Sequence, residues 1–404
     1  MTLEQMYILQ MLGGESMRTI LSPKQKENHI ENALSREQWN NIVDIVNRHA
    51  VLSLLYSKLE DCADIMPKSV WNHICQVSNR VVHTNYRLLF ATRYLTDLLE
   101  KNDVPVVVLK GAMTGYYYPK FELRKSGDID LLVSKDMLPL ASQLLVKEGY
   151  VRKTDSHSVH HVEFQTSEGI VIELHSMMIE PVENRKIDQQ IREIEREGLQ
   201  KRIRVSIMGV NLPTLSEPYH AYYLIMHMLH HYLRKGFGIK LLYDWGMFWR
   251  TEHTEDTKQQ LREMLEKSGL ITFVRTITGI CVNKLGLPEH QVDFLEIDRT
   301  ETEDMELLLQ EIWEAEEFGE STKERMVAVK GTTLRALFKE FHHQMRLNYS
   351  TVSRCVLLWP VLWIMTLVGF HHNNRTLRGV STRAVLLNAK ERSTLRSHMK
   401  IFEQ

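Results

Sequence analysis

The segment DIDLLV at residues 128–133 constrains the fold more than any other part of the chain. Side chains on a β-strand alternate between two faces, so Asp128 and Asp130 share one face while Ile129 and Leu131 share the other. Burying an ionised carboxylate without a partner is costly, whereas the apolar run after Asp130 is typical of a buried strand. We therefore expect a strand that anchors Ile129 in a core and holds the two acids in a cleft.

The surrounding sequence predicts a small α/β unit between two helical regions. Apolar residues recur at three- and four-residue spacing over much of residues 1–103 and again from Ser216 onward, which is typical of helices. Between them, the β-branched run VPVVVLKG at 104–111 predicts a buried strand, and alternating residues on either side of Ser167 predict a hairpin. One further strand is expected within residues 202–215, which brings the unit to about five strands.

Asp128 and Asp130 are candidates for binding a divalent cation. Two carboxylates at positions i and i+2 of a strand offer oxygen ligands on one side, and oxygen is the ligand that Mg²⁺ prefers. A two-metal centre for phosphoryl or nucleotidyl transfer needs a further carboxylate nearby. Glu173, which has apolar neighbours in VIELH, is one candidate, and Glu163 in HVEFQ is the alternative.

Lys110 and Gly111 form a candidate phosphate-binding turn. They stand at the end of the first expected strand, before a short expected helix in LKGAMTGYYYP. Free N–H groups at such a junction attract anions, and Lys110 adds a positive charge. Arg124, which shortly precedes the two aspartates, is able to reach the same cleft.

Charge and cysteine content narrow the classes of function. The formal net charge is −1, so no overall basic excess indicates nucleic-acid binding. Residues 289–320 hold thirteen acidic residues against one arginine, which we interpret as a solvated helix face. Four cysteines without metal-type spacing, and an amino terminus without signal-peptide features, predict a cytoplasmic protein.

A late apolar segment leaves its environment open. Residues 355–370 carry no charged side chain over sixteen positions, and the tail at 373–404 has seven basic and two acidic residues. A bilayer-spanning helix needs roughly 17–25 residues. Three interpretations stand: a buried core helix, an interfacial helix whose tryptophans and basic tail meet lipid headgroups, and a transmembrane helix. The second predicts peripheral membrane contact through residues 355–400.

The order of these motifs resembles the bacterial uncharacterised nucleotidyltransferase family, within the superfamily that has a polymerase-β-type palm. That family shows LKG, then an arginine followed by DIDLLV, then ELHW. Here the elements read VLKG at 108–111, RKSGDIDLLV at 124–133 and IELHS at 172–176. A downstream family helix is matched by GFGIKLLYDW at 236–245, with Lys240 where arginine is commoner.

The resemblance implies an α+β fold in which a polymerase-β-like nucleotidyltransferase palm occupies residues 104–215. A helical region at 1–103 would precede this palm, and a helical domain at 216–345 would follow it. Residues 346–404 would hold the apolar segment and the basic tail. The specific motifs lie between residues 108 and 245.

The resemblance also implies a Mg²⁺- or Mn²⁺-dependent transfer of a nucleoside monophosphate from an NTP to an unidentified acceptor, with release of pyrophosphate. Asp128, Asp130 and Glu173 would be the catalytic residues and the metal ligands. His161 and His175, which accompany the motif strands, are expected to line the cleft. The expected nucleotide-binding residues are Lys110, Gly111, Arg124, Ser126, Lys240 and Asp244.

Other interpretations of these residues stay open. The wider superfamily has Gly-Ser at the phosphate turn, where this chain has Lys-Gly-Ala at 110–112 and so lacks the hydroxyl. Lys240 and Asp244, four residues apart on a helix, are also able simply to pair with each other. His227 and His231 have a spacing seen in zinc sites, although no glutamate follows the first.

A function of a different class is a non-catalytic nucleotide-binding protein, or a scaffold protein docked on a membrane. A degenerate palm would be expected to have lost at least one of its carboxylates, and this chain keeps Asp128, Asp130 and Glu173. The complete set favours an enzyme.

Overall fold

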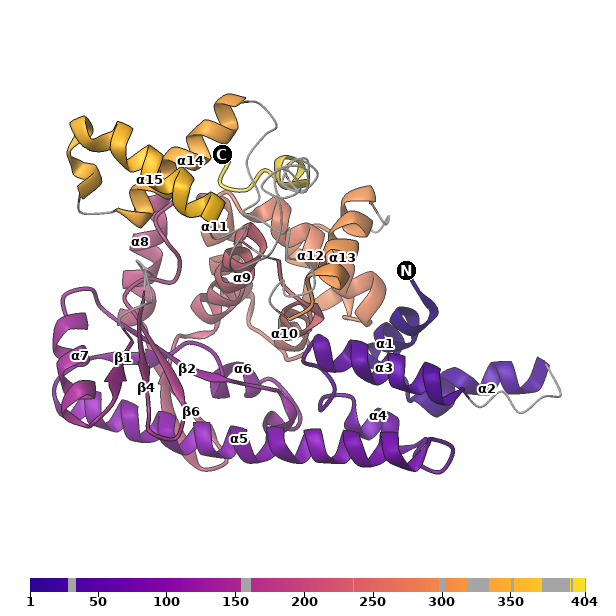
Figure 1. The fold of residues 1–404 in the computed structure, drawn as a ribbon. Helices are drawn as coiled ribbons and strands as arrows, with labels where there is room; N and C mark the ends of the chain where they lie inside the picture. Colours follow the sequence, from indigo (N-terminus) through magenta and orange to yellow (C-terminus); the bar gives the residue numbers. More distant parts are fainter. Residues whose placement is uncertain are drawn as a thin grey trace.

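Among the residues that the computed structural model describes, seven short strands form one mixed sheet (Figure 1). In chain order they are β1 (Val106–Val108), β2 (Asp128–Val133), β3 (Val151–Arg152), β4 (His161–Gln165), β5 (Val171–His175), β6 (Ile203–Ile207) and β7 (Val210–Thr214). Across the sheet the order is β3-β4-β5-β2-β1-β7-β6, with β2 parallel to β5, β1 parallel to β7 and the other neighbours antiparallel. The structure describes residues 1–27, 34–153, 161–234, 236–297, 302–317, 334–349, 352–372, 393 and 395–403.

A helix of 34 residues, α5 (Lys68–Lys101), packs along one face of the sheet (Figure 1). Its apolar stripe includes Leu95 and Leu99, which share a core with Ile129 of β2. A second helix, α7 (Leu138–Lys147), adds to the same core. The inward side of the DIDLLV strand is therefore buried, as its alternation predicts.

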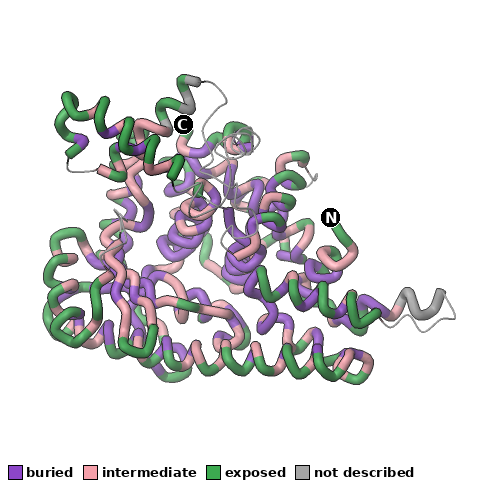
Figure 2. Tube along the Cα trace, viewed as in Figure 1, coloured by how far each residue is buried: buried purple, intermediate pink, exposed green. Residues whose placement is uncertain are grey.

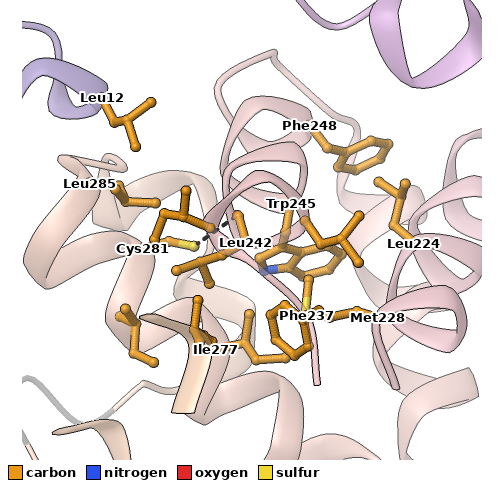
Figure 3. Packing of buried hydrophobic residues seen from close by; sticks show 14 of the residues in the cluster. Leu12, Leu224, Met228, Phe237, Leu242, Trp245, Phe248, Ile277, Cys281 and Leu285 are labelled. Carbon is orange, nitrogen blue, oxygen red and sulfur yellow. Dashed lines mark hydrogen bonds between the residues drawn. The ribbon is translucent and has the colours of Figure 1, made fainter. Parts of the chain in front are cut away.

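Helices cover the opposite face of the sheet and build the larger hydrophobic core (Figure 1). Val107 of β1 and Leu132 of β2 reach this core from the sheet. Figure 3 shows Trp245 packed among the helices, and its indole N–H donates a hydrogen bond to Thr278 Oγ1 at 2.9 Å. The elements on this side are α9 (Glu217–Arg234), α10 (Ile239–Trp249), α11 (Glu255–Lys267), α12 (Ile271–Leu285) and α13 (Glu303–Ala315), with the 3-10 turns η2 (Glu289–Gln291) and η3 (Asp293–Leu295).

The amino-terminal helices pack onto this helical core rather than standing apart. Leu12 of α1 lies near Leu285 of α12 in Figure 3, and both belong to the same buried cluster. These helices are α1 (Leu3–Gly13), α2 (Met17–Glu27), α3 (Arg36–Arg48) and α4 (Tyr56–Glu60). The remaining elements are α6 (Ala112–Gly115), η1 (Phe121–Leu123), α8 (Arg185–Gln200), α14 (Leu334–Asn348), η4 (Val352–Arg354), η5 (Val356–Leu358) and α15 (Trp359–His372).

The expected α+β class is confirmed, but the sheet differs from the prediction in two places, one of which is the unexpected two-residue strand β3. Residues 202–215 form the hairpin β6–β7 instead of a single strand. Met208 and Gly209 between the strands both have positive φ angles, 49° and 80°. Two positive φ angles in a two-residue connection are the requirement of the tight hairpin turn that matches strand twist. The sequence did not predict this turn, because methionine is not among the residues that favour such turns, which are mainly glycine, asparagine and aspartate.

The core interpretation of the apolar segment at 355–370 is wrong. In α15 only Leu362 and Thr366 are buried, and most of the other side chains are exposed. Figure 2 shows this part of the chain largely in the colour of exposed residues. Within the described residues, no helix is both long enough and apolar enough to cross a membrane.

The acidic run is not uniformly a solvated face. Glu316 pairs with Arg48, and only 12% of its side chain is exposed. The neighbouring Glu317 contacts both Lys125 and Lys240 at the rim of the sheet. The end of the run therefore joins the region after α13 to α3, to the loop before β2 and to α10.

Buried histidines should make the fold sensitive to acid. His220 is buried, and neither of its ring nitrogens has a hydrogen-bond partner in the described part of the chain. Burial, helped by the charge of Arg124, lowers the pKa of His220 to about 3. Burial, helped by Arg48, lowers the pKa of His49 to about 4. Each histidine is therefore neutral in the fold at pH values where it would be charged in the unfolded chain.

We predict that lowering the pH from 7 to 5 reduces the free energy of unfolding by about 2 kcal/mol for each of these two histidines. The stabilisation is fully present above the unfolded pKa of about 6.5 and is lost as the pH falls toward the folded value. His220→Phe keeps a ring against Tyr117 but cannot titrate, so this variant should lose less stability than the wild type. Urea unfolding of both proteins at the two pH values checks this, and equal losses would contradict it.

Candidate functional site

Three carboxylates converge at the centre of the sheet, on the face opposite α5. Asp128 and Asp130 project from β2, and Glu173 projects from β5. The two strands run parallel, and Asp130 is the Cα partner of Glu173. One oxygen of each carboxylate lies within 4.8 Å of the others. Residues in register on neighbouring strands share a face, which is why the three acids meet.

Glu163 lies on the next strand but does not join this group. It is the antiparallel partner of Glu173 on β4. Its Oε1 accepts a hydrogen bond from Lys153 Nζ at 2.5 Å, and it is absent from the groups of potential metal ligands among the described residues. Of the two candidates for the third carboxylate, Glu173 is the one that lies beside the aspartates.

Asp130 is the most deeply placed of the three acids. Its side chain is fully buried, and burial together with the Asp128 carboxylate raises the pKa of Asp130 to about 6. Its Oδ2 atom has no hydrogen-bond partner among the described residues. A buried carboxylate oxygen without a donor is costly unless a cation completes its surroundings.

His175 holds two of the carboxylates in place. Its Nε2 lies 3.1 Å from Asp130 Oδ1 and 3.2 Å from Glu173 Oε2. Burial opposes protonation, but these two contacts outweigh it and raise the pKa of His175 to about 9. The ring of His161 lies 5.0 Å from that of His175, so both expected cleft histidines stand beside the acids. His161, Glu173 and His175 form a second group able to share one ion.

Lys110 places a positive charge directly between the aspartates. Its Nζ lies 3.2 Å from Asp128 Oδ2 and 3.2 Å from Asp130 Oδ1. Burial opposes the charge, but the two carboxylates more than offset it and raise the pKa of Lys110. The ammonium group therefore compensates part of the negative charge that the strands bring together.

Gly111 makes the turn that brings Lys110 to this position. Its φ is 68°, a conformation that residues with a Cβ adopt only with strain. A Cβ at this position would lie 3.5 Å from the backbone oxygen of Asp128. The turn from β1 into α6 therefore runs close against β2 and favours glycine on conformational grounds.

Arg124 and Asp244, both expected to bind the nucleotide, form a buried ion pair with each other. Arg124 Nε and one terminal nitrogen donate to the two oxygens of Asp244, each at 2.6 Å. Tyr118 donates a third hydrogen bond to Asp244 at 2.7 Å. The Arg124 and Asp244 side chains are only 5% and 3% exposed. This buried pair ties the loop before β2 to α10.

Further polar side chains hold the same loop, and the sequence did not indicate them. Asn85 of α5 donates to the carbonyl oxygens of Glu122 and Arg124, at 2.6 and 2.8 Å. Ser53 donates to the carbonyl oxygen of Leu123 at 2.6 Å. The sequence offered one signal for these contacts, which is the polar residue Asn85 on the buried side of α5.

Lys240 does not pair with Asp244, although the two stand four residues apart on α10. Lys240 Nζ lies 3.2 Å from Glu317 Oε1, and Lys125 Nζ lies 2.7 Å from Glu317 Oε2. Ser126, the other expected nucleotide ligand, lies in the loop and its Oγ is 3.2 Å from an Arg124 nitrogen. Two lysines and one glutamate thus form an ionic cluster that the sequence did not predict.

Helix α9 faces the carboxylates from the helical side. Burial, followed by the charge of Asp130, raises the pKa of Tyr223. Burial and the charge of Lys110 lower the pKa values of His227 and His231, which stand one helical turn apart. Neither histidine belongs to a potential metal group among the described residues. Both histidines instead lie on the part of α9 that is influenced by the charge of Lys110.

The comparison with protein families agrees with this geometry. A family described as uncharacterised nucleotidyltransferase matches residues 35–286. Since the match covers more than half of the chain, the chain belongs to this family, as the motif order predicted. Membership supports a role in nucleotidyl transfer. Among curated proteins, none matches the chain.

One solved structure that aligns with part of this chain is an antigenic nucleotidyltransferase-like protein from Paracoccidioides brasiliensis. It is 15% identical in sequence to this chain, with a TM-score of 0.29. The similarity covers 45% of this chain and 88% of the fungal one.

We predict that Glu173→Gln weakens Mn²⁺ binding at least about tenfold, because an amide cannot supply the charge of the lost ligand. Glu163→Gln is the matched control, since it makes the same change on the neighbouring strand outside the carboxylate group. Calorimetric titration of Mn²⁺ into each protein measures the effect. Equal weakening in the two variants would remove Glu173 from the metal site.

We also predict that Asp244→Asn lowers the free energy of unfolding by about 3–5 kcal/mol, because it leaves the Arg124 guanidinium buried without a counter-ion. The double variant Arg124→Met/Asp244→Leu should recover part of this loss, because neither charge is then buried alone. Urea unfolding of the three proteins provides the measurement. A single variant as stable as the wild type would show that the pair is not a structural anchor.

Proposed function

We propose that this chain is a divalent-cation-dependent enzyme that moves a nucleoside monophosphate from an NTP to an acceptor hydroxyl or similar group. The observation that carries the proposal is the convergence of Asp128, Asp130 and Glu173 from two parallel strands. Family membership supports the general class of reaction. The acceptor is unidentified.

The donor set fits Mg²⁺ or Mn²⁺. Three carboxylates offer hard oxygen ligands, and the buried Oδ2 of Asp130 has no other partner among the described residues. We propose that Asp128, Asp130 and Glu173 would hold the cation. When bound, such a cation neutralises phosphate charge and orients the phosphates for displacement.

The proposed reaction has a simple balance of bonds. The acceptor oxygen forms a bond to the α-phosphorus, the bond from that phosphorus to the bridging oxygen breaks, and pyrophosphate leaves. The proton of the acceptor goes to a base, for which we propose Glu173. The contact from His175 to Glu173 keeps this carboxylate oriented toward the aspartates.

We propose that Lys110, Gly111, Ser126 and Lys240 contact the nucleotide directly. Lys110 already lies among the carboxylates, where it is able to compensate phosphate charge. Arg124 and Asp244 act differently in this proposal, because their charged atoms bind each other. They position the loop that carries Ser126 and leads into β2.

The proposed domains keep the boundaries expected from the sequence. They are a helical region at 1–103, the palm at 104–215, a helical domain at 216–345, and residues 346–404. The helix α5 serves both of the first two, because its early residues join the helical core and its later leucines join the palm core.

A non-catalytic nucleotide-binding or scaffold protein is the competing function. It requires no preserved cation site, whereas this chain brings three carboxylates, a lysine and a histidine together. The two functions differ in whether a label from NTP becomes covalently attached to an acceptor.

We predict that the purified chain, given Mg²⁺, cell extract and each α-phosphate-labelled NTP in turn, attaches label to an acceptor and releases pyrophosphate. Asp130→Asn should reduce labelling at least about a hundredfold, in line with the loss of one essential charged group from a catalytic centre. Asp136→Asn, an exposed aspartate just beyond β2, is the matched control and should label like the wild type.

Two results would contradict the proposal. One is equal labelling by the wild type and Asp130→Asn, which would place the chemistry elsewhere. The other is tight NTP binding by the wild type with no label on any acceptor, which would favour the non-catalytic function.

A further inference from the structure

Helix α15 and the turn η5 before it present an apolar surface to solvent. Leu357, Val361 and Ile364 are 87%, 55% and 64% exposed. Val356, Val368 and other apolar neighbours are exposed beside them. Isolated exposed apolar residues are common, but a contiguous group of this kind marks a surface that binds something. We call these residues the α15 surface.

The orientation of this surface is fixed by packing on its other side. Leu362 and Thr366 are the buried residues of α15, and the helix packs against α14. Trp363 Nε1 donates to His342 Nδ1 at 3.1 Å, and Trp359 Nε1 donates to the carbonyl oxygen of Ser353 at 2.8 Å. Because hydrogen bonds within the protein hold both indoles, the rotation of α15 is fixed and the same side chains always face solvent.

The segment that carries the α15 surface has a net positive charge. Residues 334–372 contain four lysines and arginines against one glutamate. Arg335, Lys339, Arg346 and Arg354 are all exposed. A partner that is both apolar and negatively charged complements this segment.

We propose that the α15 surface docks on a membrane that contains anionic phospholipids. Acyl chains accept the exposed valines, leucines and isoleucine, while the headgroup phosphates meet the arginines and the lysine of residues 334–372. The 14 residues of α15 extend for about 21 Å, and the packing of its inner side on α14 holds the helix along the membrane plane. This docking goes beyond nucleotidyl transfer and does not depend on it.

The test is co-flotation of the full chain with vesicles. Phosphatidylcholine vesicles that contain phosphatidylglycerol should carry the wild type, and vesicles of phosphatidylcholine alone should carry it at least about tenfold less. Val361→Glu should lower binding to the anionic vesicles at least about tenfold, because it puts a charge into the acyl region.

The chain offers a closely matched control for this variant. Val146 is a valine on helix α7 with 53% of its surface exposed, against 55% for Val361. Val146→Glu therefore makes the same chemical change at the same exposure, away from the α15 surface. It should bind vesicles like the wild type.

Substitutions of the basic residues test the electrostatic part of the proposal independently. Arg346→Gln/Arg354→Gln should weaken binding to anionic vesicles about tenfold or more, and raising the salt concentration should do the same to the wild type. The matched control is Arg152→Gln/Arg202→Gln, two exposed arginines of the palm region. Unchanged binding in the α15 pair would overturn the electrostatic part of the proposal.

Other outcomes overturn the docking proposal as a whole. One is a wild type that floats with neither type of vesicle. Another is a self-associating wild type, seen by analytical ultracentrifugation, that becomes monomeric on Val361→Glu without any vesicle binding. That result would assign the α15 surface to a second copy of the chain. Neither outcome affects label transfer from NTP, so the two proposals fail separately.

Discussion

The parallel pairing of β2 with β5 is the constraint on which the site depends. Strands that run in the same direction need a long crossover, and here the crossover contains α7, β3 and β4. Only the observed register places Glu173 beside Asp130. A slip of one residue would turn Glu173 to the opposite face, into the core beneath α5, and bring Leu174 to the aspartates. The apolar residues that alternate with the acids make that slip unfavourable, so the same pattern builds both core and site.

A second constraint is the attachment of the palm to the helices. The Arg124–Asp244 pair joins the loop before β2 to α10, and Asn85 and Ser53 hold the backbone of that loop. Arg124 and Asp244, which belong to the family motifs, therefore act as structural anchors. A bidentate buried pair is geometrically demanding, which suits it to fixing the position of a loop. The fixed loop in turn sets the position of the aspartates at the start of β2.

The sequence predicted much of the site because the site is local to its strands. Period-two alternation placed Asp128 and Asp130 on one face and Ile129 in the core, and apolar neighbours marked Glu173. The sequence failed where partners come from distant parts of the chain. Lys240 pairs with Glu317 rather than Asp244, and no spacing rule relates positions 77 residues apart. The hairpin β6–β7 was missed because its turn uses methionine, and the surroundings of α15 stayed open because an apolar run does not show what covers it.

The lysine between the two aspartates has a consequence for how the carboxylates are held together. Carboxylates held close together repel one another unless a positive charge lies beside them. Here the chain carries an ammonium group within 3.2 Å of both aspartates, supplied by the turn that follows β1. The charge balance of the centre is thus partly encoded in the polypeptide itself. An ammonium group built into the chain thus offsets part of the repulsion that would otherwise push the two ends of one strand's acidic pair apart.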